Sequence, residues 1–430
     1  MRHVIVGNSA AAIGCVEGLR RYDKDSPITI ISDEPHHTYS RPMISYLLGG
    51  LVDESRMAYR PRDFYEKHKV ETLLGVEVTR VSPRERVIFL AGGGSMAYDR
   101  LLIATGGKPF VPPVPGANLK GVFTFVKWDE ARQIARYIDE HQAKSALVIG
   151  AGLIGLKTIE ALLARGIKVT VVELADRILS TIFDPTAARL AEIILRREGV
   201  ELRTKTTVGE IIGRGGRVDH AVLRDGERVN CDMVVFAIGV RPNTGLVPTD
   251  SGIQIERGIR VDAHMRTTAP GVYAAGDCVE AYDMLADSYH QLAIWPLAYR
   301  QGNIAGTNMA GVERAYEGGF PMNSISVCDV PTISVGLVEP PDDGDPARYE
   351  VLDDYDRETL TYKKLILRGH RLVGALFFND IDRAGIYTGL IRDQADITQF
   401  KDHLLSGSFG LISLPKDYRK HLVTGSGIEV

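Results

Sequence analysis

Two stretches of the chain share one pattern of hydrophobic and polar positions. Each begins with a short β-branched run, passes through a glycine turn into a segment of helical periodicity, and ends with an apolar run followed by an acid. The first stretch covers residues 4–34, with a helix expected to about Arg21, and the second covers residues 146–173, with a helix expected to about Arg165. Apolar runs of this length bounded by glycines predict buried strands. Each stretch therefore predicts a strand–helix–strand unit of the nucleotide-binding kind.

The second unit carries the sequence GAGLIG at residues 150–155. Gly150 permits the tight turn, Gly152 lets the backbone approach a diphosphate, and Gly155 allows close packing of the helix, whose amino end then receives the phosphate charge. Glu173 ends the next strand, where a carboxylate can bond both hydroxyls of an adenosine ribose and would repel a 2′-phosphate. This unit therefore predicts a site that prefers NAD(H) to NADP(H).

The first unit is a degenerate version of the same turn. Gly7 is kept, whereas Ser9 and Ala12 stand where the second and third glycines would be. Two acids, Asp33 and Glu34, follow its second strand, and either of them can be the acid that bonds a ribose. The first unit thus predicts a second nucleotide site whose acid is ambiguous.

Further along the chain, three apolar runs end in small residues at positions 101–107, 233–243 and 272–278. In the last of them, the carboxylate of Asp277 follows small residues and can bond a ribityl hydroxyl. Because this run has no second unit of its own to close, it can return the chain to the first domain. The second unit would then be an insertion.

The four prolines of residues 109–116 predict the linker between the two domains. From about residue 316 the pattern changes to strands, expected at 332–338, 349–355, 360–367 and 372–378, with a hairpin turn at 368–371, a polar loop at 339–346 and a helix around 384–397. We predict an α/β fold of two Rossmann-like nucleotide-binding domains and a smaller C-terminal α+β domain. Their bounds are 1–112 with 244–315, 117–243, and 316–430.

Composition narrows the class of protein. The 430 residues carry 51 basic and 55 acidic side chains, a net charge of −4, which does not suggest nucleic acid or anionic lipid as a partner. The apolar run at the amino end, residues 4–6, is too short for a signal sequence or a membrane span. Four cysteines without a CxxC pair fit a reducing compartment: Cys15, Cys231, Cys278 and Cys328. We therefore expect a soluble, cytoplasmic protein.

The order of the motifs resembles a known family. GxSxxA at residues 7–12, ATGG at 104–107, GAGLIG, GVRPN at 239–243, and the segments 258–278 and 295–311 are similar to those of FAD-dependent pyridine nucleotide-disulfide oxidoreductases. Within that family, residues 39–50 and the Trp295-Pro296 segment most resemble NADH:rubredoxin reductases and the flavin module of NADH-dependent nitrite reductases. The resemblance covers nearly the whole chain and is weaker in the C-terminal part, which in the family often forms the dimer interface.

The resemblance implies two sets of binding residues. Around FAD it places Gly7, Ser9, Ala10, Asp33 or Glu34, Arg41, Pro42, Val78, Ala104, Thr105, Gly106, Gly276 and Asp277. It also implies that Trp295 and Pro296 open a helix aimed at the pyrimidine edge of the flavin, where a helix amino end stabilises the anionic reduced form. Around NAD it places Gly150, Gly152, Gly155, Glu173 and Gly239.

The chain departs from the family in its thiols. Members that use a disulfide carry CxxxxC or a single cysteine close to the flavin, yet no cysteine lies between Cys15 and Cys231. The His-x4-Glu pair with which glutathione-type members protonate a thiolate is also missing. We expect Cys15 and Cys278 to be packing residues, and thiol chemistry has no obvious residue here.

A second departure concerns charge. Related reductases of oxygenase systems carry a lysine and a glutamate that pair near flavin N5, and here Tyr46 and Lys157 occupy those two positions. This exchange would keep one cation near N5 but move it to the nicotinamide-binding helix. A cation there favours the reduced, anionic flavin.

The resemblance implies a FAD-dependent NADH oxidoreductase in which the nicotinamide passes a hydride to the flavin. Without a thiol relay, electrons would leave to an external one-electron iron protein: rubredoxin, ferredoxin or an iron–sulfur subunit. The alternatives are an NADH oxidase that reduces oxygen, and the NADH-binding flavin subunit of a larger redox complex. The acceptor, the direction of electron flow and the oligomeric state, whether homodimer or complex, stay open at this point.

Overall fold

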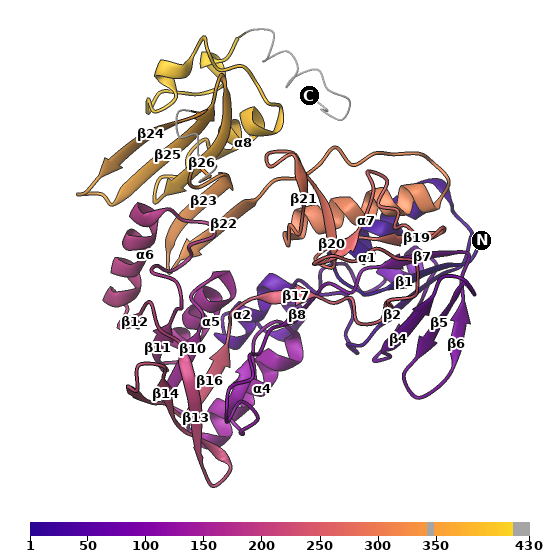
Figure 1. Cartoon of the computed structure of the whole chain (residues 1–430), viewed down its shortest axis with the longest axis horizontal. Helices are drawn as coiled ribbons and strands as arrows, with labels where there is room; N and C mark the ends of the chain where they lie inside the picture. The colour runs from indigo at the N-terminus through magenta and orange to yellow at the C-terminus, as the bar shows by residue number, and fades with distance from the viewer. Residues whose placement is uncertain (342–347, 416–430) are drawn as a thin grey trace. The chain divides into compact units, whose positions relative to one another are not determined.

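A computed structural model describes residues 1–341 and 348–415. The described residues divide into two compact units, one of Met1–Asp176 with Gly199–Phe320 and one of Arg177–Glu198 with the described residues from Pro321 onward (Figure 1). Within the described residues, no helix is both long and apolar enough to cross a bilayer.

The first unit contains two parallel five-stranded sheets. The strands of the first sheet, in spatial order, are β19 (Val272–Ala274), β7 (Arg100–Ile103), β1 (His3–Val6), β2 (Ile28–Ser32) and β3 (Val70–Leu74). Both β1 and β2 are buried along their whole length. This burial explains why their sequences are nearly continuous apolar runs, since strands of parallel sheets are covered on both faces. Because β19 pairs in parallel with β7, the chain returns to the first sheet after the second has been built.

Helices α1 (Ala10–Tyr22) and α7 (Trp295–Met309) belong to the first sheet and pack closely on each other. A Cβ atom on Gly302 would lie 1.9 Å from the carbonyl oxygen of Ala11, and one on Gly306 would lie 2.1 Å from that of Cys15. Only glycine permits this approach of two helix backbones. The crossing holds α1 and α7 in fixed positions beside the sheet.

Smaller elements surround the first sheet. They are the three-stranded antiparallel sheet β4 (Val78–Ser82), β5 (Val87–Leu90) and β6 (Ser95–Ala97); β18 (Ile259–Arg260), β20 (Val279–Asp283) and β21 (Ser288–His290); and the short helices η1 (Arg41–Met43), α2 (Ile44–Leu48), η2 (Glu54–Arg56) and α3 (Phe64–Lys67).

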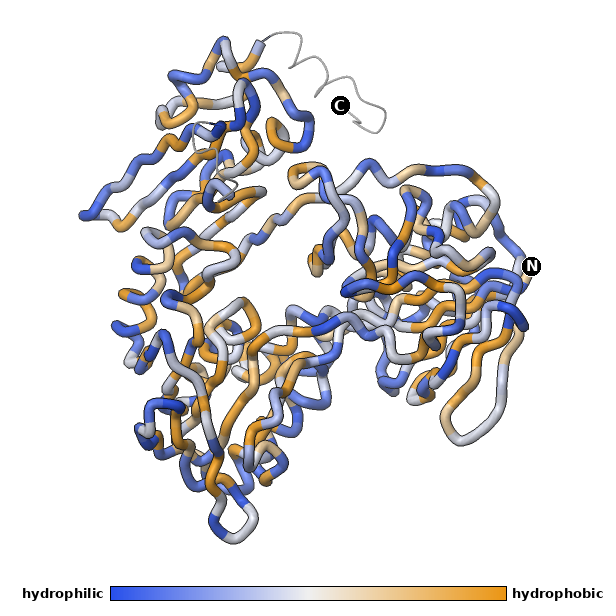
Figure 2. The backbone as a smooth tube through the Cα atoms, viewed as in Figure 1, coloured by the Kyte–Doolittle hydropathy of each residue, from blue (hydrophilic) through white to orange (hydrophobic). Residues whose placement is uncertain are grey.

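The second sheet has the order β12 (Glu201–Arg203), β11 (Lys168–Val172), β10 (Ser145–Ile149), β16 (Met233–Phe236) and β9 (Val122–Thr124). The same region contains two helices, α4 (Trp128–His141) and α5 (Leu153–Ala164). It also contains an antiparallel sheet of β13 (Val208–Arg214), β14 (Arg217–Leu223) and β15 (Arg228–Asn230). The chain enters and leaves this region through the antiparallel pair β8 (Gly107–Pro109) and β17 (Val240–Pro242). Figure 2 shows hydrophobic residues concentrated along the strands. The predicted α/β class is confirmed.

The second unit is built on the antiparallel sheet β22 (Met322–Val327), β23 (Val330–Gly336), β26 (Arg371–Phe378), β25 (Thr361–Arg368) and β24 (Tyr349–Asp356), with helices α6 (Pro185–Arg197) and α8 (Ala384–Arg392) and the turns η4 (Lys401–His403) and η5 (Leu411–Ser413). The predicted hairpin between β25 and β26 is confirmed, because Arg368 pairs with Arg371 across the turn. Strand β22 was not predicted. The predicted loop 339–346 extends into residues 342–347, which lie outside the described residues.

Helix α8 ends five residues earlier than the predicted position 397. Gln394 has a φ of 48°, which stops the helix, and Asp396 bridges to Arg371 while the Ile397 N–H donates to the His370 carbonyl. Pairing with the start of β26 therefore competes successfully with continuation of the helix.

Residues 177–198 belong to the second unit because of a buried polar cluster. Asp184 accepts the Ala187 N–H at 2.9 Å and so caps α6, and its other oxygen accepts the Tyr362 hydroxyl at 2.7 Å and Lys364 Nζ at 2.9 Å. Both charged groups are almost fully buried. A buried charge is tolerated when it is paired and hydrogen-bonded, so this cluster attaches α6 to the sheet.

Candidate functional site

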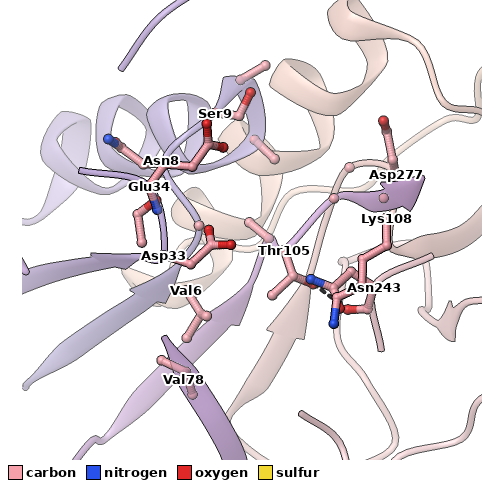
Figure 3. Close-up of a pocket in the computed structure, with 18 of the residues that line it drawn as sticks. Val6, Asn8, Ser9, Asp33, Glu34, Val78, Thr105, Lys108, Asn243 and Asp277 are labelled. Carbon is pink, nitrogen blue, oxygen red and sulfur yellow. Dashed lines mark hydrogen bonds between the residues drawn. The ribbon is translucent and has the colours of Figure 1, made fainter. Parts of the chain in front are cut away.

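A pocket lies at the carboxyl ends of the strands of the first sheet, the place where ligands bind in open parallel sheets. Most of the predicted FAD residues line it: Gly7, Ser9, Ala10, Asp33, Glu34, Arg41, Val78, Ala104, Thr105, Gly106, Gly276, Asp277 and Trp295. Pro42 and Pro296 are next to lining residues but do not line the pocket themselves. Figure 3 shows Asp33 and Asp277 on opposite sides of this pocket, with Thr105 between them.

The turn after β1 is formed by Gly7, which has a φ of 117°. A Cβ atom here would lie 2.1 Å from the carbonyl oxygen of Ala104 on the neighbouring strand end, so glycine is required. Helix α1 starts three residues later with Ser9 as its N-cap, and the Ser9 side chain makes no capping hydrogen bond. The first N–H groups of α1 therefore face the pocket as donors for an anion.

The two candidate acids differ in their surroundings. Glu34 is 7 % exposed, and both of its oxygens are engaged: Oε1 accepts Arg41 at 2.6 Å and Oε2 accepts the Tyr39 hydroxyl at 2.6 Å. Asp33 has a side chain that is 53 % exposed and pairs with Lys127 through Oδ2 alone, at 2.6 Å. Asp33 is therefore the acid better able to accept a further hydroxyl from a ligand.

Asp277 follows Gly276 at the end of β19. Burial raises the pKa of the Asp277 carboxyl, and the positive charge of Arg41 opposes this shift. The backbone around it is held in place, because Gln301 accepts the Gly276 N–H at 2.9 Å and Gln291 donates to the Asp277 carbonyl at 2.7 Å. The carboxylate is thus presented to the pocket on a rigid turn.

Several lining residues were missed by the sequence reasoning, among them His36, Glu77, Lys108 and Asn243. Lys108 directly follows ATGG, and Asn243 ends the motif GVRPN, so adjacency to a motif was the only signal. The Asn243 carbonyl accepts the Thr105 hydroxyl at 2.6 Å, and its N–H donates to Gly106. This pairing joins two segments that lie far apart in the sequence at one wall of the pocket.

The second glycine turn lies at the carboxyl end of β10. Gly150 has a φ of 100°, and a Cβ atom on Gly155 would lie 2.1 Å from the Gly150 carbonyl oxygen. A Cβ atom on Gly152, by contrast, would meet no atom within 4 Å, so a ligand has room to approach the backbone at the start of α5. These are the three roles that the sequence predicts for the glycines of such a turn.

Glu173 follows β11 and turns back toward this glycine turn. Its Oε2 accepts the Ala151 N–H at 2.7 Å and its Oε1 accepts the Ala175 N–H at 2.8 Å. Two large apolar side chains are exposed at this turn: Leu174, at 64 %, follows Glu173, and Ile238, at 37 %, lies beside Gly150. Gly239 follows Ile238 with a φ of 97°. Exposed apolar groups next to an oriented carboxylate suit a nucleoside, and sequence reasoning missed both of them.

Lys157 and Tyr46, predicted to lie near the flavin, are not among the residues that line the first pocket. Lys157 on α5 pairs with Glu160 at 2.6 Å. Tyr46 lies on α2, is 44 % exposed, and belongs to a helix that packs on α5. Their roles stay predictions.

None of Cys15, Cys231 and Cys278 lines the first pocket. Cys15, Cys231 and Cys278 are buried, and burial raises the pKa of the Cys278 thiol to about 11. At neutral pH such a thiol stays protonated and is a poor nucleophile. Among the described residues, no group of three or more His, Cys, Asp or Glu side chains is placed to hold a metal ion.

Comparison with known proteins agrees with this geometry. Residues 1–302 match the model of the family described as pyridine nucleotide-disulphide oxidoreductase, and residues 321–395 match the rubredoxin NAD+ reductase C-terminal domain. The chain therefore belongs to the pyridine nucleotide-disulphide oxidoreductase family, whose members bind FAD and NAD(H), and it is an oxidoreductase. The predicted resemblance is confirmed.

Three curated relatives are similar over much of the chain. An NADH oxidase of Methanocaldococcus jannaschii is 34 % identical over 78 % of this chain and 75 % of its own length. The epsilon subunit of an NADH-dependent phenylglyoxylate dehydrogenase of Aromatoleum evansii is 30 % identical over 94 % of both chains. A nitrite reductase [NAD(P)H] of Bacillus subtilis is 33 % identical over 92 % of this chain, which spans about half, 48 %, of that relative.

Among solved structures, the covalent putidaredoxin reductase–putidaredoxin complex matches with a TM-score of 0.83 and 25 % identity, over 92 % of this chain and 94 % of the other.

Proposed function

We propose that this chain is a FAD-dependent oxidoreductase that transfers electrons between NADH and an external one-electron iron protein, through the flavin and without a redox disulfide. The observation that carries this proposal is the presence of two separate nucleotide turns, each at the carboxyl end of its own parallel sheet, while Cys15, Cys231 and Cys278 are buried. A cytoplasmic setting, where NADH is available and cysteines stay reduced, accords with this activity.

The first pocket suits FAD. Gly7 permits the tight turn from β1 toward α1, and the free amino end of α1 provides donors for a diphosphate. Asp33 and Asp277, on opposite sides of the pocket, are acceptors for the hydroxyls of the ribose and of the ribityl chain. Trp295 and the start of α7 line the same pocket, so a helix amino end is available to the flavin. When bound, the flavin accepts two electrons as a hydride and releases them singly.

The second turn suits NADH. The open space at Gly152 admits the diphosphate, and Leu174 and Ile238 offer apolar contacts for the adenine. The two backbone N–H groups hold the Glu173 carboxylate in one orientation while each oxygen keeps a lone pair for a ribose hydroxyl. A fixed negative charge at this position disfavours the 2′-phosphate of NADPH.

An iron protein is the proposed partner on three grounds. The C-terminal part matches the domain of rubredoxin reductases, and a solved relative is named as a complex with putidaredoxin. The buried thiols of Cys15, Cys231 and Cys278 offer electrons no route beyond the flavin. The chain would promote hydride transfer by positioning the two bound nucleotides, since that reaction needs no acid or base from the protein.

The test is a stopped-flow experiment on protein reduced anaerobically with NADH. We expect rubredoxin or ferredoxin to reoxidise it within the time of one catalytic turnover, and air to reoxidise it at least tenfold more slowly. Reoxidation by air at the rate of turnover, with no response to either iron protein, would contradict the proposal. It would favour the NADH oxidase alternative, which is the activity for which the Methanocaldococcus relative is named.

A subunit of a larger complex is the second candidate. The similarity to the phenylglyoxylate dehydrogenase subunit extends over 94 % of both chains, so the match includes the C-terminal part. In that case an iron–sulfur protein would co-purify with the chain, and the isolated chain would reduce dyes without physiological turnover.

A further inference from the structure

The segment that follows β2, residues 33–41, forms hydrogen bonds and ion pairs with the residues at the start of helix α4. Four successive residues are held: Arg41 donates to the Val126 carbonyl at 3.0 Å, and Lys127 pairs with Asp33 at 2.6 Å. The Trp128 N–H donates to the Tyr39 hydroxyl at 3.2 Å, and Asp129 pairs with His36 at 2.9 Å. The two segments are almost ninety residues apart in the sequence.

Aromatic packing reinforces the same contact. The ring of His36 stacks on Trp128 with centroids 4.6 Å apart, and the ring of Tyr39 meets Trp128 edge to face at 5.3 Å. Edge-to-face and stacked aromatic pairs of this kind stabilise a contact beyond the area that they bury.

Glu34 organises this contact from within. It accepts hydrogen bonds from both Tyr39 and Arg41. The Tyr39 hydroxyl oxygen also accepts the Trp128 N–H, and a second guanidinium nitrogen of Arg41 donates to the Val126 carbonyl. Because Glu34 is buried, its carboxylate needs both of these hydrogen-bond donors. If either side chain moved away, it would leave a buried carboxylate oxygen without a partner. The carboxylate thus fixes both side chains in the conformations that reach Val126 and Trp128.

The same segment is a wall of the first pocket, because Asp33, Glu34, His36, Tyr39 and Arg41 all line it together with Val126. Helix α4 follows strand β9, which pairs with β16 in the second sheet, and Gly239 follows β16. A group that fills the first pocket therefore rests on residues that also hold the edge of the second sheet.

We infer that Glu34 is a positioning residue, not a FAD ligand, and that with Tyr39 and Arg41 it couples occupation of the FAD pocket to the placement of the nicotinamide-binding region through the start of α4. Asp33 is left as the acid that bonds the FAD ribose. The inference rests on the proposed function, in that the first pocket holds FAD.

Hydrogen exchange measured on the full chain tests this coupling. The peptide that covers residues 126–134 would be compared in the FAD-bound wild type, in the protein stripped of FAD, and in the FAD-bound Tyr39→Phe variant. Loss of one hydrogen bond to the Trp128 N–H predicts roughly tenfold faster exchange in this peptide for the last two samples. In Tyr39→Phe the absorbance spectrum should show normal FAD content, and KM for NADH should rise severalfold while free-flavin release stays unchanged.

Tyr137→Phe is the matched control, because Tyr137 lies on the same helix and donates to the Asp232 carbonyl at its other end. This variant should leave the peptide and KM unchanged. Asp33→Asn should release FAD about tenfold more readily. Glu34→Gln keeps the shape of the side chain and should show the same faster exchange and higher KM as Tyr39→Phe, so it replaces Tyr39→Phe if the latter folds poorly.

Exchange in residues 126–134 that is the same with and without FAD, in a protein that binds FAD normally, would overturn the coupling. FAD release that increases in Glu34→Gln but not in Asp33→Asn would overturn the assignment of the two acids. A wild-type protein that takes up no FAD at all would instead contradict the proposed function, so the two failures can be told apart.

Discussion

Replacing Glu173 with glutamine is the sharpest perturbation of cofactor choice. The wild-type carboxylate accepts two backbone N–H groups, at 2.7 and 2.8 Å, and the glutamine amide can accept only one of them. A hydrogen bond to a charged group contributes about 1.5–3 kcal/mol, and the orientation of the side chain toward the ribose depends on both bonds. We therefore expect kcat/KM for NADH to fall about tenfold to hundredfold.

The same change removes a negative charge from the position of the 2′-phosphate. Two unit charges 4 Å apart repel by about 4 kcal/mol at an effective dielectric constant of 20, and solvent reduces that figure at a site that is partly exposed. A tenfold gain with NADPH is a conservative expectation. The ratio of kcat/KM for NADH to that for NADPH should thus fall roughly hundredfold to thousandfold.

The assay is steady-state reduction of a one-electron dye by each nucleotide at the same ionic strength. Glu201→Gln is the control, because Glu201 is an acid on β12 of the same sheet that pairs with Arg203 away from the glycine turn. An unchanged ratio in Glu173→Gln, or an equal change in the control, would refute the assignment of Glu173 to the ribose.

Three further predictions follow from the geometry. Gly302→Ala should destabilise the protein by about 1–3 kcal/mol and weaken FAD binding, because the added methyl would lie 1.9 Å from the Ala11 carbonyl and push α1 from α7; normal thermal stability and FAD content would contradict this. Lys157→Ala should lower the flavin midpoint potential by spectroscopic titration if Lys157 provides the cation near N5, whereas an unchanged potential would leave that cation to another residue. Since burial raises the pKa of Asp277, the contribution of this group to the stability of the protein without FAD falls as pH rises above the ordinary carboxyl pKa; Asp277→Asn should remove that contribution, so denaturant titrations should show stability rising more steeply with pH in the variant than in the wild type, and identical pH profiles would contradict this.

The strands and glycine turns could be predicted because their signals are local. The apolar runs that became β1, β2, β10 and β11 are buried on both faces, and Gly7 and Gly150 have the positive φ that the turns require. The residues of the first pocket could also be predicted in large part. Gly7, Asp33 and Glu34 closely follow β1 and β2, whereas Arg41 and Val78 were implied by the resemblance to the family.

What could not be predicted depends on contacts between distant segments. Asp33 and Glu34 are adjacent and chemically alike, and only the approach of Tyr39, Arg41 and the start of α4 separates their roles. The assignment of residues 177–198 to the second unit likewise depends on Asp184 meeting Lys364. No periodicity in the sequence reports such pairs.

The exposed apolar residues are a third such case. Leu174 and Ile238 have no signal as binding residues in the sequence, because their exposure appears only when β11 and β16 are placed beside β10.

The central claim is that electrons pass from nicotinamide to flavin and then directly to the partner, with sulfur taking no part. The most direct test is single-turnover stopped-flow kinetics of a variant in which Cys15, Cys231, Cys278 and Cys328 are all replaced by alanine, with wild-type FAD content and folding verified first. The account predicts that NADH reduces this variant, and that the iron-protein acceptor reoxidises it, at rates within about twofold of the wild type. Normal reduction by NADH followed by loss of transfer to the acceptor would contradict it.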